Sequence, residues 1–96
     1  MKYHFSMKII AVCTCSGMKE KAEAAFKIMC PDEEIPKIYK GESAIRKLAE
    51  QNPNTNLSRY LLAIAKKNGQ FAYLIDYDDN GDIISNYDLK TGKRVA

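Results

Sequence analysis

The most constraining feature of this 96-residue sequence lies near its C-terminus, where two β-rich runs flank an acidic turn. The runs are Phe71–Tyr77 and Ile83–Leu89, and the turn between them contains Asn80-Gly81. Asn-Gly between two such runs is the strongest short-range signal for a β-hairpin. We therefore expect an antiparallel pair here, followed by a turn at Lys90-Thr91-Gly92 and a short charged edge strand at 93–96.

A first strand is expected at the other end of the chain, from Tyr3 to Cys15. In its first half only the odd positions are apolar, whereas from Ile10 and Val12 onward the even positions are apolar as well. This change is typical of a strand that enters the middle of a sheet, where both of its faces are covered. Ser16-Gly17 is expected to end the strand and to begin a helix.

Three helical patterns occupy the middle of the chain. The first runs from Ser16 to about Cys30, and the proline-containing segment 31–41 after it is interpreted as a loop. The second begins near Ser43 and ends at Asn52-Pro53. The third follows this turn and is capped by Asn68-Gly69. The apolar stripes are Met18, Ala22, Phe26 and Met29; Ile45, Leu48 and Ala49; and Leu57, Tyr60, Leu61, Ile64 and Ala65.

The order β-α-α-α-β-β(-β) predicts a single α+β domain over residues 1–96. We expect two layers, a three- to four-stranded and largely antiparallel sheet with the helices packed on one face. A chain of this length excludes a large multidomain enzyme, and 46% hydrophobic with 28% charged residues is typical of a globular protein. No apolar run reaches the length of a membrane span, and no signal peptide is expected. Three cysteines, an odd number, favour free thiols and a cytoplasmic location.

The first candidate for chemistry is the segment Cys13–Lys19, where a strand is expected to meet a helix. A thiolate beside a helix N-terminus has a lowered pKa and can lie next to bound phosphate. If the chain is an enzyme, Cys13, Cys15 and Lys19 are its candidate catalytic residues. The alternative is that both thiols pack in the core and that the helix begins with an ordinary cap.

This segment resembles the phosphate loop of the low-molecular-weight protein tyrosine phosphatases, on Ile9–Thr14 and Ala22–Phe26. The resemblance implies that Cys13 is a nucleophile. The family's loop-closing Arg is replaced by Lys19 at a spacing one residue short, and the family's Asp-Pro pair is absent. Cys15–Met18 is similar, at a shifted spacing, to the cysteine-phosphorylated IIB domains of sugar transport. Neither family's activity is assigned to the chain.

A second candidate is the acidic hairpin turn, which resembles the first eight positions of an EF-hand loop. Asp76, Asp78 and Asn80 match its first three oxygen ligands, and Asp82 adds a fourth oxygen-bearing side chain. At the twelfth position Tyr87 stands where the loop requires a bidentate Glu. Calcium bound at this turn is therefore expected to have no better than millimolar affinity. The alternative is a hairpin tip built from turn-forming residues, in which Asn-Gly adopts a type I′ turn.

Other polar residues suggest a binding role. The candidate partner-binding residues are three tyrosines expected to be exposed on the hairpin and three basic residues of the third helix: Tyr73, Tyr77, Tyr87, Arg59, Lys66 and Lys67. A wider basic set could contact nucleic acid, with Tyr60, Tyr73 or Tyr77 stacking on bases: Arg46, Lys47, Arg59, Lys66, Lys67, Lys93 and Arg94. These charges are equally explained as solvated helix faces. A zinc site at His4, Cys13, Cys15 and Cys30 would lack paired C-x-x-C spacing.

No complete catalytic signature is present in the sequence. By elimination, we expect a non-enzymatic binding module, of the inhibitor or adaptor type, that occupies a surface on a macromolecular partner in a bacterial or phage-like setting. A protein partner is expected and no membrane. A Cys-dependent enzyme and a nucleic-acid-binding domain remain as alternatives. The sequence leaves the oligomeric state open.

Overall fold

The computed structural model describes residues 8–67 and 69–95, which form a small α+β domain around a four-stranded sheet. The elements follow the order β1 (Lys8–Cys13), α1 (Ser16–Met29), β2 (Ile38–Lys40), α2 (Glu42–Glu50), α3 (Asn56–Ala65), β3 (Ala72–Tyr77) and β4 (Ile83–Asp88). The α+β class predicted from the sequence is confirmed. Within the described residues, no helix is both long and apolar enough to cross a membrane.

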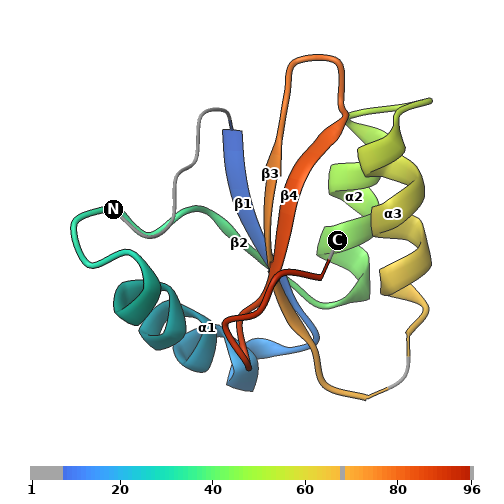
Figure 1. Cartoon of the computed structure of the whole chain (residues 1–96). Helices are drawn as coiled ribbons and strands as arrows, with labels where there is room; N and C mark the ends of the chain where they lie inside the picture. The colour runs from blue at the N-terminus through green and yellow to red at the C-terminus, as the bar shows by residue number, and fades with distance from the viewer. Residues whose placement is uncertain (1–7, 68, 96) are drawn as a thin grey trace.

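The strands lie in the order β2-β1-β3-β4 (Figure 1). β1 pairs antiparallel with β3, and β3 pairs antiparallel with β4, so the predicted hairpin is confirmed. β2 pairs parallel with β1, which makes the sheet mixed. It lies inside segment 31–41, which was expected to be only a loop. Parallel strands require a crossover connection, and α1 supplies it.

The helices cover both faces of the sheet, which corrects the prediction that they pack on one face (Figure 1). On one face, Ile10, Val12 and Ile75 form a core with α2 and α3. On the other, Ala11, Cys13 and Leu74 form a second core with α1. The physical reason is that β1 and β3 are apolar on both faces, so each face needs its own helical layer.

Several local predictions are confirmed and others are refined. Ile45, Leu48 and Ala49 of α2 are buried, and α3 begins at the N-cap Thr55, whose Oγ1 accepts a hydrogen bond from Ser58 N at 3.1 Å. The N-cap of α1 is Cys15, not Ser16. The expected edge strand at 93–96 is reduced to a bridge between Tyr87 and Arg94. Residues 3–7 of the predicted first strand lie outside the described residues.

The hairpin turn differs from the two-residue turn that Asn-Gly favours. Asp78–Asp82 form a five-residue loop between Tyr77 and Ile83. Gly81 has a φ of +77°, whereas a type I′ turn requires positive φ at both central residues. Gly81 also packs directly against Thr55, and its carbonyl accepts a hydrogen bond from Leu57 N at 2.9 Å. The turn is therefore shaped by its contact with the start of α3.

Candidate functional site

The cysteine segment links the end of β1 to the start of α1. Cys13 is fully buried in the core beneath α1, whereas Cys15 is exposed. The Cys13 thiol donates a hydrogen bond to the Cys15 carbonyl at 3.6 Å. Burial raises the pKa of Cys13, and the nearby Cys15 thiol raises it further. The hydrogen bond to the Cys15 backbone, followed by Lys40 and Lys19, lowers this pKa less strongly. The pKa change is opposite to that of an activated nucleophile, which needs a lowered pKa. This environment favours a structural role for Cys13.

The three thiols are expected to differ in reactivity with a disulfide reagent. Cys13 and Cys30 are buried and burial raises the pKa of both, so they should remain unreacted in the folded protein. Cys15 is exposed and should react. Titration near neutral pH should therefore modify one thiol in the native protein and all three after denaturation.

Cys15→Ser is the control for this titration, since it should abolish the reaction of the native protein. Rapid modification of Cys13 in that variant would contradict its buried environment. It would revive the hypothesis of Cys-dependent chemistry at Cys13 and Lys19.

The proposed calcium ligands do not converge. Asp76 is buried within β3, away from the exposed turn. Asp78 Oδ1 accepts hydrogen bonds from the backbone N–H groups of Asn80 and Asp82, each at 2.9 Å. Asp82 Oδ1 accepts one from Asn56 Nδ2 at 2.7 Å. Among residues 8–67 and 69–95, no group of three or more His, Cys, Asp or Glu side chains could hold a metal. These hydrogen bonds support a structural role for the acidic turn.

The cysteines of the predicted zinc site also do not form a metal-holding cluster in the described part of the chain. Cys13 and Cys30 are buried and Cys15 is exposed, and no metal-holding cluster includes any of them there. His4 lies outside the described residues.

The hairpin tyrosines are not exposed together, as the sequence analysis expected. Tyr73 is buried, with 7% of its surface exposed, because β3 is an inner strand with both faces covered. Tyr77 is half-buried against the core beneath α2 and α3. Tyr87 is half-buried against the core beneath α1, on the opposite face. The three rings therefore do not form a common surface.

The basic candidates, Arg59 on α3 and Lys66 and Lys67 just after it, differ in their contacts. Arg59 hydrogen-bonds to Asn56 Oδ1, and Lys66 is exposed. Lys67 Nζ donates to the Tyr73 hydroxyl at 2.7 Å, and this hydrogen bond raises the pKa of Lys67. The partner-binding role of Arg59, Lys66 and Lys67 stays a prediction.

The wider nucleic-acid set is spread over α2, α3 and the C-terminal segment. Arg46 forms an ion pair with Glu42 at 2.8 Å. Arg94 donates a hydrogen bond to the Ile84 carbonyl at 3.1 Å. Tyr60, the expected stacking partner, is half-buried and packs against the core beneath α2 and α3.

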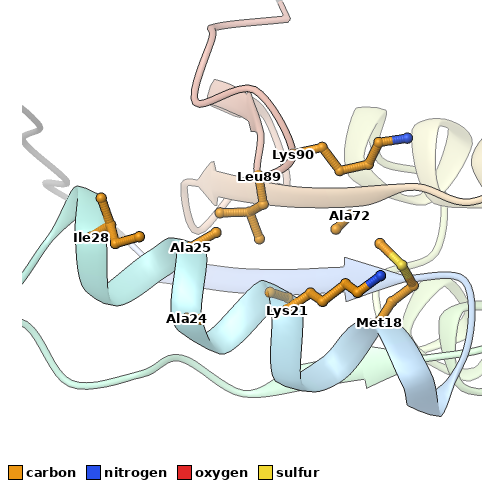
Figure 2. A pocket seen from close by; sticks show the side chains of 9 residues that line it. Met18, Lys21, Ala24, Ala25, Ile28, Ala72, Leu89 and Lys90 are labelled. Atoms are coloured by element: carbon orange, nitrogen blue, oxygen red, sulfur yellow. The ribbon is translucent and has the colours of Figure 1, made fainter.

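The structure reveals a different candidate, an apolar groove beside α1 of about 380 Å³ (Figure 2). Its buried residues are Met18, Ala22, Ala72 and Leu89, and its exposed ones are Lys21, Ala24, Ile28 and Lys90, with Ala25 half-buried between them. Figure 2 shows Leu89 projecting toward α1 from the segment after β4. Small alanine side chains on this side of α1 leave the space open.

The groove follows from the unequal covering of the two sheet faces. A helix with its side chains is about 10–12 Å across and strands lie about 4.8 Å apart, so one helix covers little more than two strands. The helices α2 and α3 cover one face of the sheet. Among the described residues, α1 alone covers the other face. It packs over β1, β2 and β3. The groove opens between α1, the start of β3 and the segment just after β4.

The charged residues that line the groove are both positive. Lys21 and Lys90 lie on its two sides, and no acidic residue lines it (Figure 2). Lys90 Nζ donates a hydrogen bond to the Gln70 carbonyl at 3.0 Å, which ties this side chain to the segment before β3. An apolar floor with lysines at its sides suits a ligand that is apolar on one face and acidic at its margins.

The amino-acid sequence contains one signal for this groove. Ile28 lies off the apolar stripe of Met18, Ala22, Phe26 and Met29, and it is 83% exposed. An apolar residue outside the core stripe of an amphipathic helix is the feature that pointed here. Leu89 and Ala72 could not be assigned to the groove because their proximity to α1 depends on the tertiary fold.

Comparison with known proteins finds no relative of this chain: no family model matches it, and neither does any curated protein or solved structure.

Proposed function

We propose that this protein is a binding module that receives a helix of a partner protein in the groove between α1 and the segment after β4. The observation that carries the proposal is the exposed apolar lining of this groove, above all Ile28 at 83% exposure. Exposing a large apolar side chain contributes nothing to folding, whereas such side chains often anchor protein interfaces.

The shape of the uncovered region favours a helix as the occupant. On the opposite face two helices lie side by side over the sheet. A partner helix beside α1 would add a second helix on this face, with apolar residues against Leu89 and Ile28. Acidic residues at its margins would face Lys21 and Lys90. This is the helix-in-groove form of recognition.

We also place the protein in a reducing compartment such as the cytoplasm. Its three cysteines are free, and two of them are buried as small apolar core residues.

The proposal is tested with Ile28→Glu, which adds a charge to the groove. Tagged wild type and variant are compared in a pull-down from nuclease-treated lysate of the native host, with a high-salt wash. The retained partner is then purified and its affinity measured by calorimetry. We expect Ile28→Glu to weaken that affinity at least about tenfold, because a charge would be buried against an apolar surface.

Leu62→Glu is the matched control, since Leu62 is also apolar and partly exposed but lies on α3, away from the groove. It should bind within about twofold of wild type. Equal affinity of Ile28→Glu and wild type would overturn the groove as the site. Recovery of nuclease-sensitive material alone would favour the nucleic-acid alternative.

A further inference from the structure

The outer edge of β2 is a second surface with unusual features. β2 is an edge strand, and no strand of the described residues pairs with its outer side. Ala11 N donates to the Lys37 carbonyl and Gly41 N donates to the Cys13 carbonyl, so the odd-numbered residues of this segment face β1. In a parallel ladder the alternate residues face the other way. Ile38 and Lys40 therefore direct their backbone N–H and C=O groups outward.

A basic groove lies along this edge, between β2 and α2. It has a volume of about 380 Å³ and is lined by Lys37, Ile38, Tyr39, Lys40, Ala44, Lys47, Leu48 and Gln51. No acidic residue lines it, and its three lysines form no ion pair in the described part of the chain. Lys37 Nζ lies 5.1 Å from the centre of the Tyr39 ring, which holds this charge over the strand.

The outward backbone groups of β2 and the lysines beside them indicate which kind of segment this edge binds. Outward N–H and C=O groups accept an extended backbone, because a strand supplies the matching acceptors and donors. Unpaired lysines beside them favour acidic side chains on that strand. They also disfavour a second copy of this chain at the same edge, since its own lysines would repel them.

We propose that the outer edge of β2 binds an extended acidic segment of a partner protein by strand addition. Backbone hydrogen bonds to Ile38 and Lys40 set the alignment, and Lys37, Lys40 and Lys47 select the acidic residues. β2 and β4 are at opposite edges of the sheet. This site is therefore independent of the groove beside α1, and either one can fail without the other.

The probe is a labelled ten-residue peptide of alternating glutamate and valine, with the full-length protein as the receptor. We expect saturable binding by fluorescence anisotropy and slower hydrogen exchange at the amides of Ile38 and Lys40. A peptide of the same sequence with every backbone amide N-methylated keeps the charge but cannot pair as a strand from either edge. It should bind at least tenfold more weakly. Equal binding of the two peptides would reduce the effect to charge attraction and would overturn the proposal.

Variants locate the site. Lys40→Gln removes one charge while keeping the outward N–H, and it should weaken binding severalfold. Lys66→Gln, the matched control, removes an exposed lysine after α3 and should bind as wild type does. Ile28→Glu should also bind as wild type, which separates this site from the groove beside α1. Displacement of the peptide by single-stranded DNA without protection of Ile38 and Lys40 would instead assign the edge to nucleic acid and overturn strand addition.

Discussion

Replacing Phe26 with alanine is expected to lower the free energy of unfolding by about 3–5 kcal/mol. Phe26 is 1% exposed and fills the core beneath α1, together with Cys13 and Leu74. Because α1 covers this sheet face in the described residues, no second helix there can close over the cavity. Domains are stable by only about 5–15 kcal/mol in total, so the loss is a large share. Urea unfolding followed by circular dichroism should show a lower midpoint with an unchanged slope.

The matched control is Ile28→Ala, two positions further along the same helix. Ile28 is 83% exposed, so the change should alter the free energy of unfolding by no more than about 0.5 kcal/mol. A loss at Ile28 as large as that at Phe26 would mean that α1 packs with a different face against the sheet. The difference in stability between the Phe26 and Ile28 variants also bears on function. If Ile28 contributes nothing to stability, a binding role in the groove remains a physical reason for an apolar residue there.

The local elements of the fold were accessible from the sequence because their signals are local. The stripe of α3 and the apolar residues of α2 depend on helical spacing alone, and they are buried as expected apart from the half-buried Tyr60. The two-sided apolarity at Ile10 and Val12 likewise predicted an inner strand, and β1 lies between β2 and β3. The hairpin was found because its turn and both strands are contiguous.

The remaining features depend on contacts between distant segments. Ile38–Lys40 is too short to show an alternating pattern, and it becomes a strand because Ala11–Cys13 lie beside it. The distribution of helices over the two faces follows from that parallel pairing, which places α1 opposite α2 and α3. Tyr73 was expected to be exposed because a β-rich run does not reveal whether its strand lies at the edge or inside the sheet.

The candidate sites likewise combine features that the local sequence predicts with features that depend on contacts between distant segments. Cys13 was correctly placed at the junction of a strand and a helix, but its burial depends on α1 packing over it. The acidic turn residues were recognised as oxygen donors, yet Asp78 directs its carboxylate oxygen to the N–H groups of its own turn. Both grooves lie between elements that are distant in sequence. Only the groove beside α1 has a signal in the sequence, the position of Ile28 outside its helical stripe, and that signal was not recognised.

Replacing Gly81 with alanine should destabilise the protein through two separate effects. Its φ of +77° lies in the left-handed region, where a side chain costs about 1–2 kcal/mol. An added Cβ would also overlap the side chain of Thr55, the N-cap of α3. Overpacking of this kind typically costs about 1–3 kcal/mol. We therefore expect a total loss of about 2–5 kcal/mol in the free energy of unfolding, measured by urea denaturation.

Gly69→Ala separates the two effects. Gly69 has a φ of +91°, but a Cβ there would meet no heavy atom within 4 Å. That variant should lose only the backbone contribution of about 1–2 kcal/mol. The difference between the two variants then measures the contact between the hairpin turn and the start of α3. Equal losses would mean that the turn and α3 can move apart at little cost. Since Leu57 N also donates to the Gly81 carbonyl, a large difference is the expected result: this contact joins the C-terminal hairpin to the helical layer.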